Sequence, residues 1–256
     1  MTSPASDSDY WTVSRTPFCG LMFILPFLIV YEIGVFEIGL SDTGRNAADV
    51  WIRFALRDSG VPGDWALPAL VLVVLLGWHL AQRKPFRCDA QILSGMFAES
   101  LLFAAALLAG GRAWQSVIAA DVSDPIAQRA VSFLGAGIYE ELLFRLLMIP
   151  LLYGLLRLCW TPRLLAMALS ALMSSGLFAL AHYADAPTLM ALLNLQDAAE
   201  TVWTMPEHWY SFQFRLAAGV MFSLLFWMRG FGITVGCHLL YDLLVGVVLR
   251  GVPGSE

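Results

Sequence analysis

Charged residues are scarce in this sequence: Asp, Glu, Lys and Arg make up only 14% of its 256 residues. No basic tract is long enough to suggest nucleic acid, so we expect no nucleic-acid partner. No small-x-small cleavage site follows the polar N-terminus, so the first apolar run is expected to stay in the membrane. The four cysteines lack the Cys-x-x-Cys or His-rich spacing of a zinc site, and we expect them to be structural. They are Cys19, Cys88, Cys159 and Cys237.

Apolar residues predominate in the sequence. They make up 59% of the chain, and the mean hydropathy is +0.70. This composition predicts an all-α, polytopic integral membrane bundle of about seven to eight transmembrane helices. A polar tail at 1–16, disordered or lying on the surface, precedes a single transmembrane domain at 17–250. The expected spans are 17–40, 65–81, 91–111, 126–150, 164–183, 209–228 and 231–249.

Basic residues orient the spans. The densest cluster, Arg83, Lys84 and Arg87, is expected in the cytoplasm, which makes the N-terminus cytoplasmic too. The acidic segment 184–208 then lies outside, which agrees with the rule that basic residues stay in the cytoplasm. Segment 41–64 reads as a short interfacial helix, but its three arginines fall on the wrong side of the membrane.

Two adjacent glutamates and an arginine interrupt the fourth apolar run, in the pattern Glu140-Glu141-x-x-x-Arg145. Charge inside a membrane is costly, so these groups need partners or a function. On a helix, Glu141 and Arg145 stand four residues apart on one face and can pair. Glu140 points to a different face, and this leaves it as the unpaired acid.

Later apolar runs carry two more polar pairs at helical spacing. Phe178 and His182 lie four apart near the end of the fifth run, and His238 and Asp242 lie four apart in the seventh. We expect Glu140, His182 and His238 to line one cavity, close enough for a water or metal to bridge at least two of them. The expected span limits place His182 nearer the outer surface than the other two, so some helix ends must differ from the hydropathy limits.

Other charged or polar residues within apolar runs match no motif. We expect them to be structural, protonated or interfacial, although Glu99, near the centre of its span, is a candidate to line the same cavity. They are Glu32, His79, Glu99 and Arg215.

Taken in order, the three patterns resemble the motifs of the CAAX-protease and bacteriocin-processing family of glutamic-type intramembrane endopeptidases. The resemblance covers residues 132–249. It implies a membrane-embedded protease that cuts a membrane-anchored protein or peptide near its anchor or C-terminal region, and a bacterial inner membrane is the favoured location. It also implies site roles: Glu140 and His182 activate water, Glu141 and Arg145 form a supporting ion pair, and His238 and Asp242 stabilise the oxyanion.

Asp242 stands where the eukaryotic prenyl-protein proteases commonly have asparagine. An ionised aspartate cannot donate to an oxyanion, so Asp242 either stays protonated or, as we prefer, orients His238. The same four residues, Glu140, His182, His238 and Asp242, also make a possible ligand set for a divalent metal such as zinc, although no cofactor is favoured. A proton-coupled transporter and a non-catalytic immunity or scaffold protein remain alternative functions.

Overall fold

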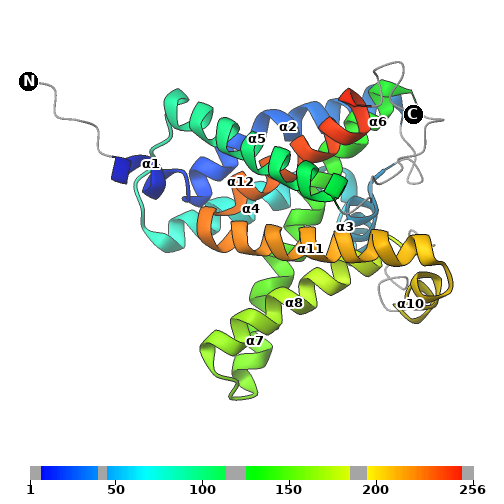
Figure 1. The fold of residues 1–256 in the computed structure, drawn as a ribbon. Coiled ribbons are helices and arrows are strands. Elements are labelled where there is room, and N and C mark those ends of the chain that lie inside the picture. Colours follow the sequence, from blue (N-terminus) through cyan, green and yellow to red (C-terminus); the bar gives the residue numbers. More distant parts are fainter. Residues whose placement is uncertain (1–6, 40–44, 114–124, 185–194, 250–256) are drawn as a thin grey trace, which may run out of the picture.

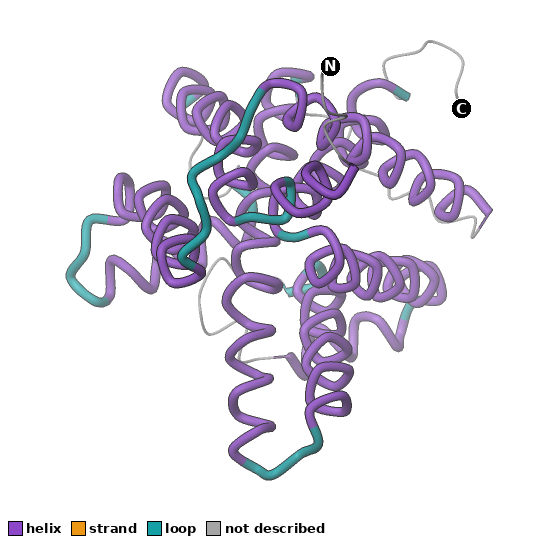
Figure 2. The backbone as a smooth tube through the Cα atoms, turned by 90° about the vertical axis from the view of Figure 1, so that its left-hand side faces the viewer, coloured by secondary structure: helices purple, strands orange, loops and turns teal. Residues whose placement is uncertain are grey.

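The computed structural model describes residues 7–39, 45–113, 125–184 and 195–249. Within these ranges the chain is helical throughout and contains no strand (Figures 1 and 2). The predicted all-α membrane bundle is therefore confirmed.

Six described helices are long and apolar enough to cross a membrane. They lie in α2 (Pro17–Ile38), α4 (Gly63–Gln82), α5 (Ala90–Ala113), α8 (Arg163–Ala181), α11 (Pro206–Arg229), and α12 (Phe231–Leu243) together with η4 (Leu244–Val248). They correspond to six of the seven expected spans. A short helix, α10 (Leu195–Thr204), precedes α11.

The remaining expected span is not one regular helix. Two π-helical stretches interrupt it, and such wider turns occur mostly at functional sites. Its parts are α6 (Ile126–Gly135), η2 (Ala136–Glu140), η3 (Leu142–Met148) and α7 (Ile149–Leu158). The hairpin of α7 and α8 projects from the bundle at a steep angle (Figure 1). This inclination accounts for the expected mismatch in depth, because it allows the end of α8 to reach the level of η2.

Part of the expected polar tail is a helix, α1 (Asp7–Val13), that packs onto the bundle. The Tyr10 hydroxyl donates to Glu99 Oε2 at 2.7 Å, and Arg229 pairs with Glu99 Oε1 at 2.5 Å. The suggestion that Glu99 lines the motif cavity is therefore wrong. Its carboxylate joins α5 to α1 and to the end of α11, a structural role.

Segment 41–64 contains the expected helix, α3 (Ala47–Asp58), and one face of it is buried against the bundle. Asp49 is fully buried and pairs with Arg53, which is 2% exposed, at 2.5 Å. Arg53 also pairs with Glu32 of α2 at 2.9 Å, and Glu32 accepts a hydrogen bond from Tyr139 of η2. This network holds α3 against the segment that carries Glu140.

Close backbone contact brings the motif helices together. A Cβ at Gly137 of η2 would lie 2.6 Å from Cβ and 2.8 Å from the backbone nitrogen of Leu239 in α12. Only glycine permits this approach, since a real Cβ would push the two backbones apart. Glu140 and His238 lie near this contact, one on each side of it.

Two of the four cysteines have a structural role in the described part of the chain. Cys19 of α2 and Cys88, just before α5, form a disulfide with Cα atoms 5.2 Å apart. Cys159 is exposed and Cys237 is buried, and both are free thiols.

Candidate active site

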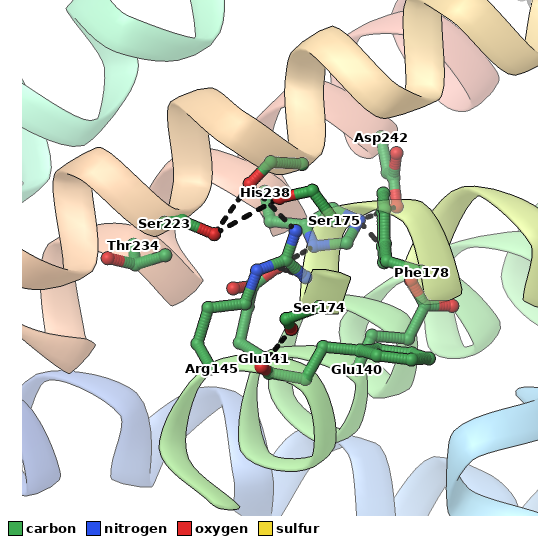
Figure 3. Close-up of polar contacts among 12 residues, drawn as sticks. Glu140, Glu141, Arg145, Ser174, Ser175, Phe178, Ser223, Thr234, His238 and Asp242 are labelled. Atoms are coloured by element: carbon green, nitrogen blue, oxygen red, sulfur yellow. Dashed lines mark hydrogen bonds and ion pairs between the residues drawn. The ribbon is translucent and has the colours of Figure 1, made fainter. Parts of the chain in front are cut away.

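The two adjacent glutamates separate as predicted (Figure 3). Glu141 Oε1 lies 2.9 Å from Arg145 Nη1, and both side chains are fully buried. Glu140 turns away from this pair and lines a cavity instead. The division into a paired and an unpaired acid is confirmed.

This cavity has a volume of about 210 Å³ and lies among η2, α8, α11 and α12. The residues that the three sequence patterns predicted to form one site line this cavity. Its lining includes Glu140, Phe178, His182, His238 and Asp242, together with Asn46 and Arg215, which belong to no motif. The predicted convergence on one cavity is confirmed.

His182 caps the C-terminal end of α8, where backbone carbonyls lose their helical partners. Its ring satisfies one of them, because Nδ1 donates to the Phe178 carbonyl at 2.8 Å. With Nδ1 fixed as the donor, Nε2 of the neutral ring is an acceptor. Nε2 lies 3.9 Å from Glu140 Oε2.

His238 is held by Glu141 and not, as expected, by Asp242. Its Nδ1 donates to Glu141 Oε1 at 2.7 Å, so one carboxylate oxygen binds both Arg145 and His238. Nε2 therefore faces the cavity, 3.8 Å from Glu140 Oε2 and 3.5 Å from Asp242 Oδ2. Asp242 lies beside the ring on its cavity side and makes no hydrogen bond to it among the described contacts.

One oxygen at the centre of this group lacks a partner. Glu140 Oε2 is buried and has no hydrogen bond within the described part of the chain. The two Nε2 atoms that face it, at 3.9 and 3.8 Å, are too distant for direct hydrogen bonds. Polar groups more than 3.5 Å apart can be bridged by a water, and the space among these three atoms is the candidate position for it.

Aromatic rings fix the ion pair beneath this position. The guanidinium carbon of Arg145 lies 4.2 Å from the centre of the Phe178 ring and 5.3 Å from that of Phe222. Phe222 also stacks on His238, with ring centres 4.6 Å apart. Phe178 therefore packs directly against the Arg145 side of the ion pair.

Asn46 is a contact that the motifs did not predict. Its Oδ1 accepts from Ala48 N at 2.9 Å and caps α3, while its Nδ2 donates to Glu140 Oε1 at 2.5 Å. One side chain thus anchors α3 and positions the unpaired glutamate. The only signal in the sequence was a good capping residue before a helix, which says nothing about a distant carboxylate.

We expect Asn46→Ser to lower kcat about tenfold while leaving KM and the melting temperature near those of the wild type. Serine caps a helix as well as asparagine does, but its short hydroxyl does not replace the amide that reaches Glu140. A hydrogen bond to a charged group contributes about 1.5–3 kcal/mol, enough for an effect of this size. Kinetics and thermal melting of the purified variant measure both quantities.

Thr16 offers a matched control, since it caps α2 by accepting from Cys19 N at 3.2 Å and does not line the cavity. Thr16→Ala should lower stability by about 1 kcal/mol and leave kcat unchanged. A loss of activity in Asn46→Ser that only follows the loss of folded protein would refute the positioning role.

The residues present do not form a ready metal site. Among the described residues, no three His, Cys, Asp or Glu side chains are arranged to hold a metal ion. The proposed ligand set of Glu140, His182, His238 and Asp242 lines the cavity without meeting that arrangement. We therefore derive no step through a metal.

Comparison with known families agrees with this geometry. The model of the family described as Type II CAAX prenyl endopeptidase Rce1-like matches residues 122–244. This match identifies an Rce1-like domain at residues 122–244. The Rce1-like region contains all three motifs, so the resemblance inferred from them is confirmed, and the family implies a protease in a membrane. Neither a search of curated proteins nor a search of solved structures gave a match.

Proposed function

We propose that the protein is an intramembrane endopeptidase of the glutamic type, in which Glu140 and His182 activate water. The observation that carries this proposal is the buried Glu140 Oε2, which has no partner among the described residues and faces two imidazole nitrogens at 3.9 and 3.8 Å. A water held there has a carboxylate to take its proton. The water donates its other hydrogen to His182 Nε2, and this second hydrogen bond orients the water.

In the hydrolytic step, the water oxygen bonds to the peptide carbonyl carbon while Glu140 takes one proton. Negative charge then develops on the carbonyl oxygen and requires a donor. Since Nδ1 of His238 already donates to Glu141, a proton on Nε2 makes the ring an imidazolium with Glu141 on one side and Asp242 on the other. When the C–N bond breaks, Glu140 passes its proton to the leaving amine.

We propose that the substrate is a membrane-anchored protein or peptide, cut near its anchor or in its C-terminal region. The position of the cavity among apolar helices supports an anchored substrate. We propose a bacterial inner membrane with a cytoplasmic N-terminus. Trp11, Lys84 and Gly230 line one surface pocket, so α1, the basic loop and the turn before α12 lie at the same end of the bundle.

The direct test is cleavage by purified protein reconstituted in lipid vesicles. We expect a set of membrane-anchored peptides with varied C-terminal regions to include some that are cut, with one ¹⁸O from labelled water in each new carboxyl group. Mass spectrometry measures both, and protein-free vesicles are the control. No cleavage, together with proton movement reported by a pH-sensitive dye inside the vesicles, would refute the peptidase and favour the transporter.

A further inference from the structure

Arg215 of α11 lines the same cavity as Glu140, His182, His238 and Asp242, although it belongs to no motif. The sequence predicted a structural role for it. Its position beside the candidate active site instead raises the question of what its charge binds.

The contacts of Arg215 hold the side chain but do not neutralise it. Nη1 donates to the Tyr183 hydroxyl at 2.8 Å and to Ser211 Oγ at 2.7 Å, and the guanidinium carbon lies 5.2 Å from the centre of the Tyr183 ring. All of these partners are uncharged. The guanidinium is thus fixed in place by groups that leave its positive charge available.

Three of the four buried arginines among the described residues have carboxylate partners, Arg129 being the exception. Arg53, Arg145 and Arg229 each pair with a glutamate or aspartate at 2.9 Å or less. Within the described residues, no ion pair is found for Arg215, and Asp242, which lines the same cavity, is not within salt-bridge distance of it.

The unused edge of this guanidinium suits a carboxylate. Both hydrogen bonds from described residues use Nη1, and Nε is buried without a partner. Nε and Nη2 form the fork that binds the two oxygens of a carboxylate with parallel hydrogen bonds. Arg215 is half-buried and has no anion beside it, so a carboxylate that enters the cavity would supply the missing charge partner and accept from donors that no described residue satisfies.

We propose that Arg215 binds a carboxylate of the substrate within a few residues of the bond that is cut. The cavity volume of about 210 Å³ sets this limit. Arg215 and Glu140 line this one small cavity, so only a short piece of chain separates a group bound by Arg215 from a bond beside Glu140. The carboxylate is either the free C-terminus of the substrate or an Asp or Glu side chain. This inference rests on the proposed peptidase function and assigns part of its specificity.

The test uses three membrane-anchored peptides of one sequence in vesicles with full-length protein. The first ends in a free carboxylate close to the cut bond, the second in an amide, and the third in an amide with a Glu side chain one position earlier. For the wild type we expect kcat/KM on the amide to fall about 10–100-fold relative to the carboxylate, mainly through KM. The third peptide regains this loss only if a side-chain carboxylate is accepted.

Variants of Arg215 connect the effect to this residue. In Arg215→Gln the carboxylate and the amide should be cut at similar rates, and Arg215→Lys, which keeps the charge without the fork, should give an intermediate ratio. Arg157→Gln is the matched control, because Arg157 is exposed and donates to Thr161 O, away from the cavity. Its ratio should equal that of the wild type.

Two outcomes overturn the inference: a wild type that cuts all three peptides at the same rate, or a preference for the carboxylate peptides of equal size in Arg215→Gln. The first needs no variant, so it applies even if substitutions of Arg215 do not fold. Peptide binding to the Glu140→Gln protein separates this inference from the peptidase itself. If the amide binds more weakly than the carboxylate but the wild type cuts neither peptide, the carboxylate site at Arg215 is supported and the peptidase function is refuted. If the wild type cuts both peptides equally well, the peptidase function is supported and the carboxylate site is refuted.

Discussion

Glu140→Gln is expected to reduce kcat by about 10²–10⁴-fold, the usual contribution of a general base, while the protein remains folded. Glutamine has nearly the same shape, and its carbonyl oxygen can still accept from Asn46, which donates to Glu140 Oε1 at 2.5 Å. The other carboxylate oxygen has no partner among the described residues, so its substitution leaves no protein donor unpaired. Single-turnover cleavage and thermal melting of the purified variant measure the two effects.

Glu141→Gln should act in the opposite way, by lowering stability. Its Oε1 accepts from both Arg145 and His238, at 2.9 and 2.7 Å. Loss of the carboxylate leaves the fully buried Arg145 without its ion-pair partner, a cost of roughly 3–5 kcal/mol. Detergent-extracted yield and melting temperature should both fall.

A second substitution tests whether the unpaired charge causes this loss. Adding Arg145→Gln to Glu141→Gln removes the isolated cation and should recover part of the stability, although His238 still lacks its acceptor. Equal loss of folded protein from Glu140→Gln and Glu141→Gln would contradict the division between a catalytic and a supporting glutamate.

Helical periodicity was sufficient to predict this division. The four-residue spacing placed Glu141 with Arg145 and turned Glu140 elsewhere, and the π-helical stretches on either side of Glu141 did not change that outcome. The same spacing related Phe178 to His182. What periodicity could not show was the depth of His182, since that depends on the inclination of the α7 and α8 hairpin, a property of tertiary packing.

The sequence was less informative about side chains that pair with residues on another helix. Arg45 and Arg53 count against the expected orientation under a rule based on basic residues in loops, and that rule does not detect internal ion pairs. Both pair with the fully buried Asp49 at the four-residue spacing, but the ion pair of Arg53 with Glu32 of α2, at 2.9 Å, joins two helices and could not be read from spacing. Asn46 and Arg215 reach the site from helices that carry no motif, so only the fold could reveal them.

The role of Asp242 changes most between sequence and structure. Glu141 already accepts the Nδ1 proton of His238, so Asp242 is not needed to orient the ring. Its Oδ2 instead lies 3.5 Å from Nε2, the nitrogen that faces the cavity. From this position it can stabilise a doubly protonated His238, and one substitution distinguishes this role from the metal-ligand role that the sequence had left open.

We expect Asp242→Asn to remain active within about 10²–10³-fold of the wild type, the usual contribution of one oxyanion donor. Asparagine keeps the shape, and its amide can donate into the cavity where the carboxylate cannot. If Asp242 were instead a metal ligand, asparagine would bind the metal less well, and metal content would fall together with activity. Bound metal is measured in both purified proteins, and cleavage is assayed with and without a chelator. A chelator-sensitive wild type with about one equivalent of zinc would refute the glutamic mechanism, whereas an active, metal-free enzyme would support Glu140 as the base.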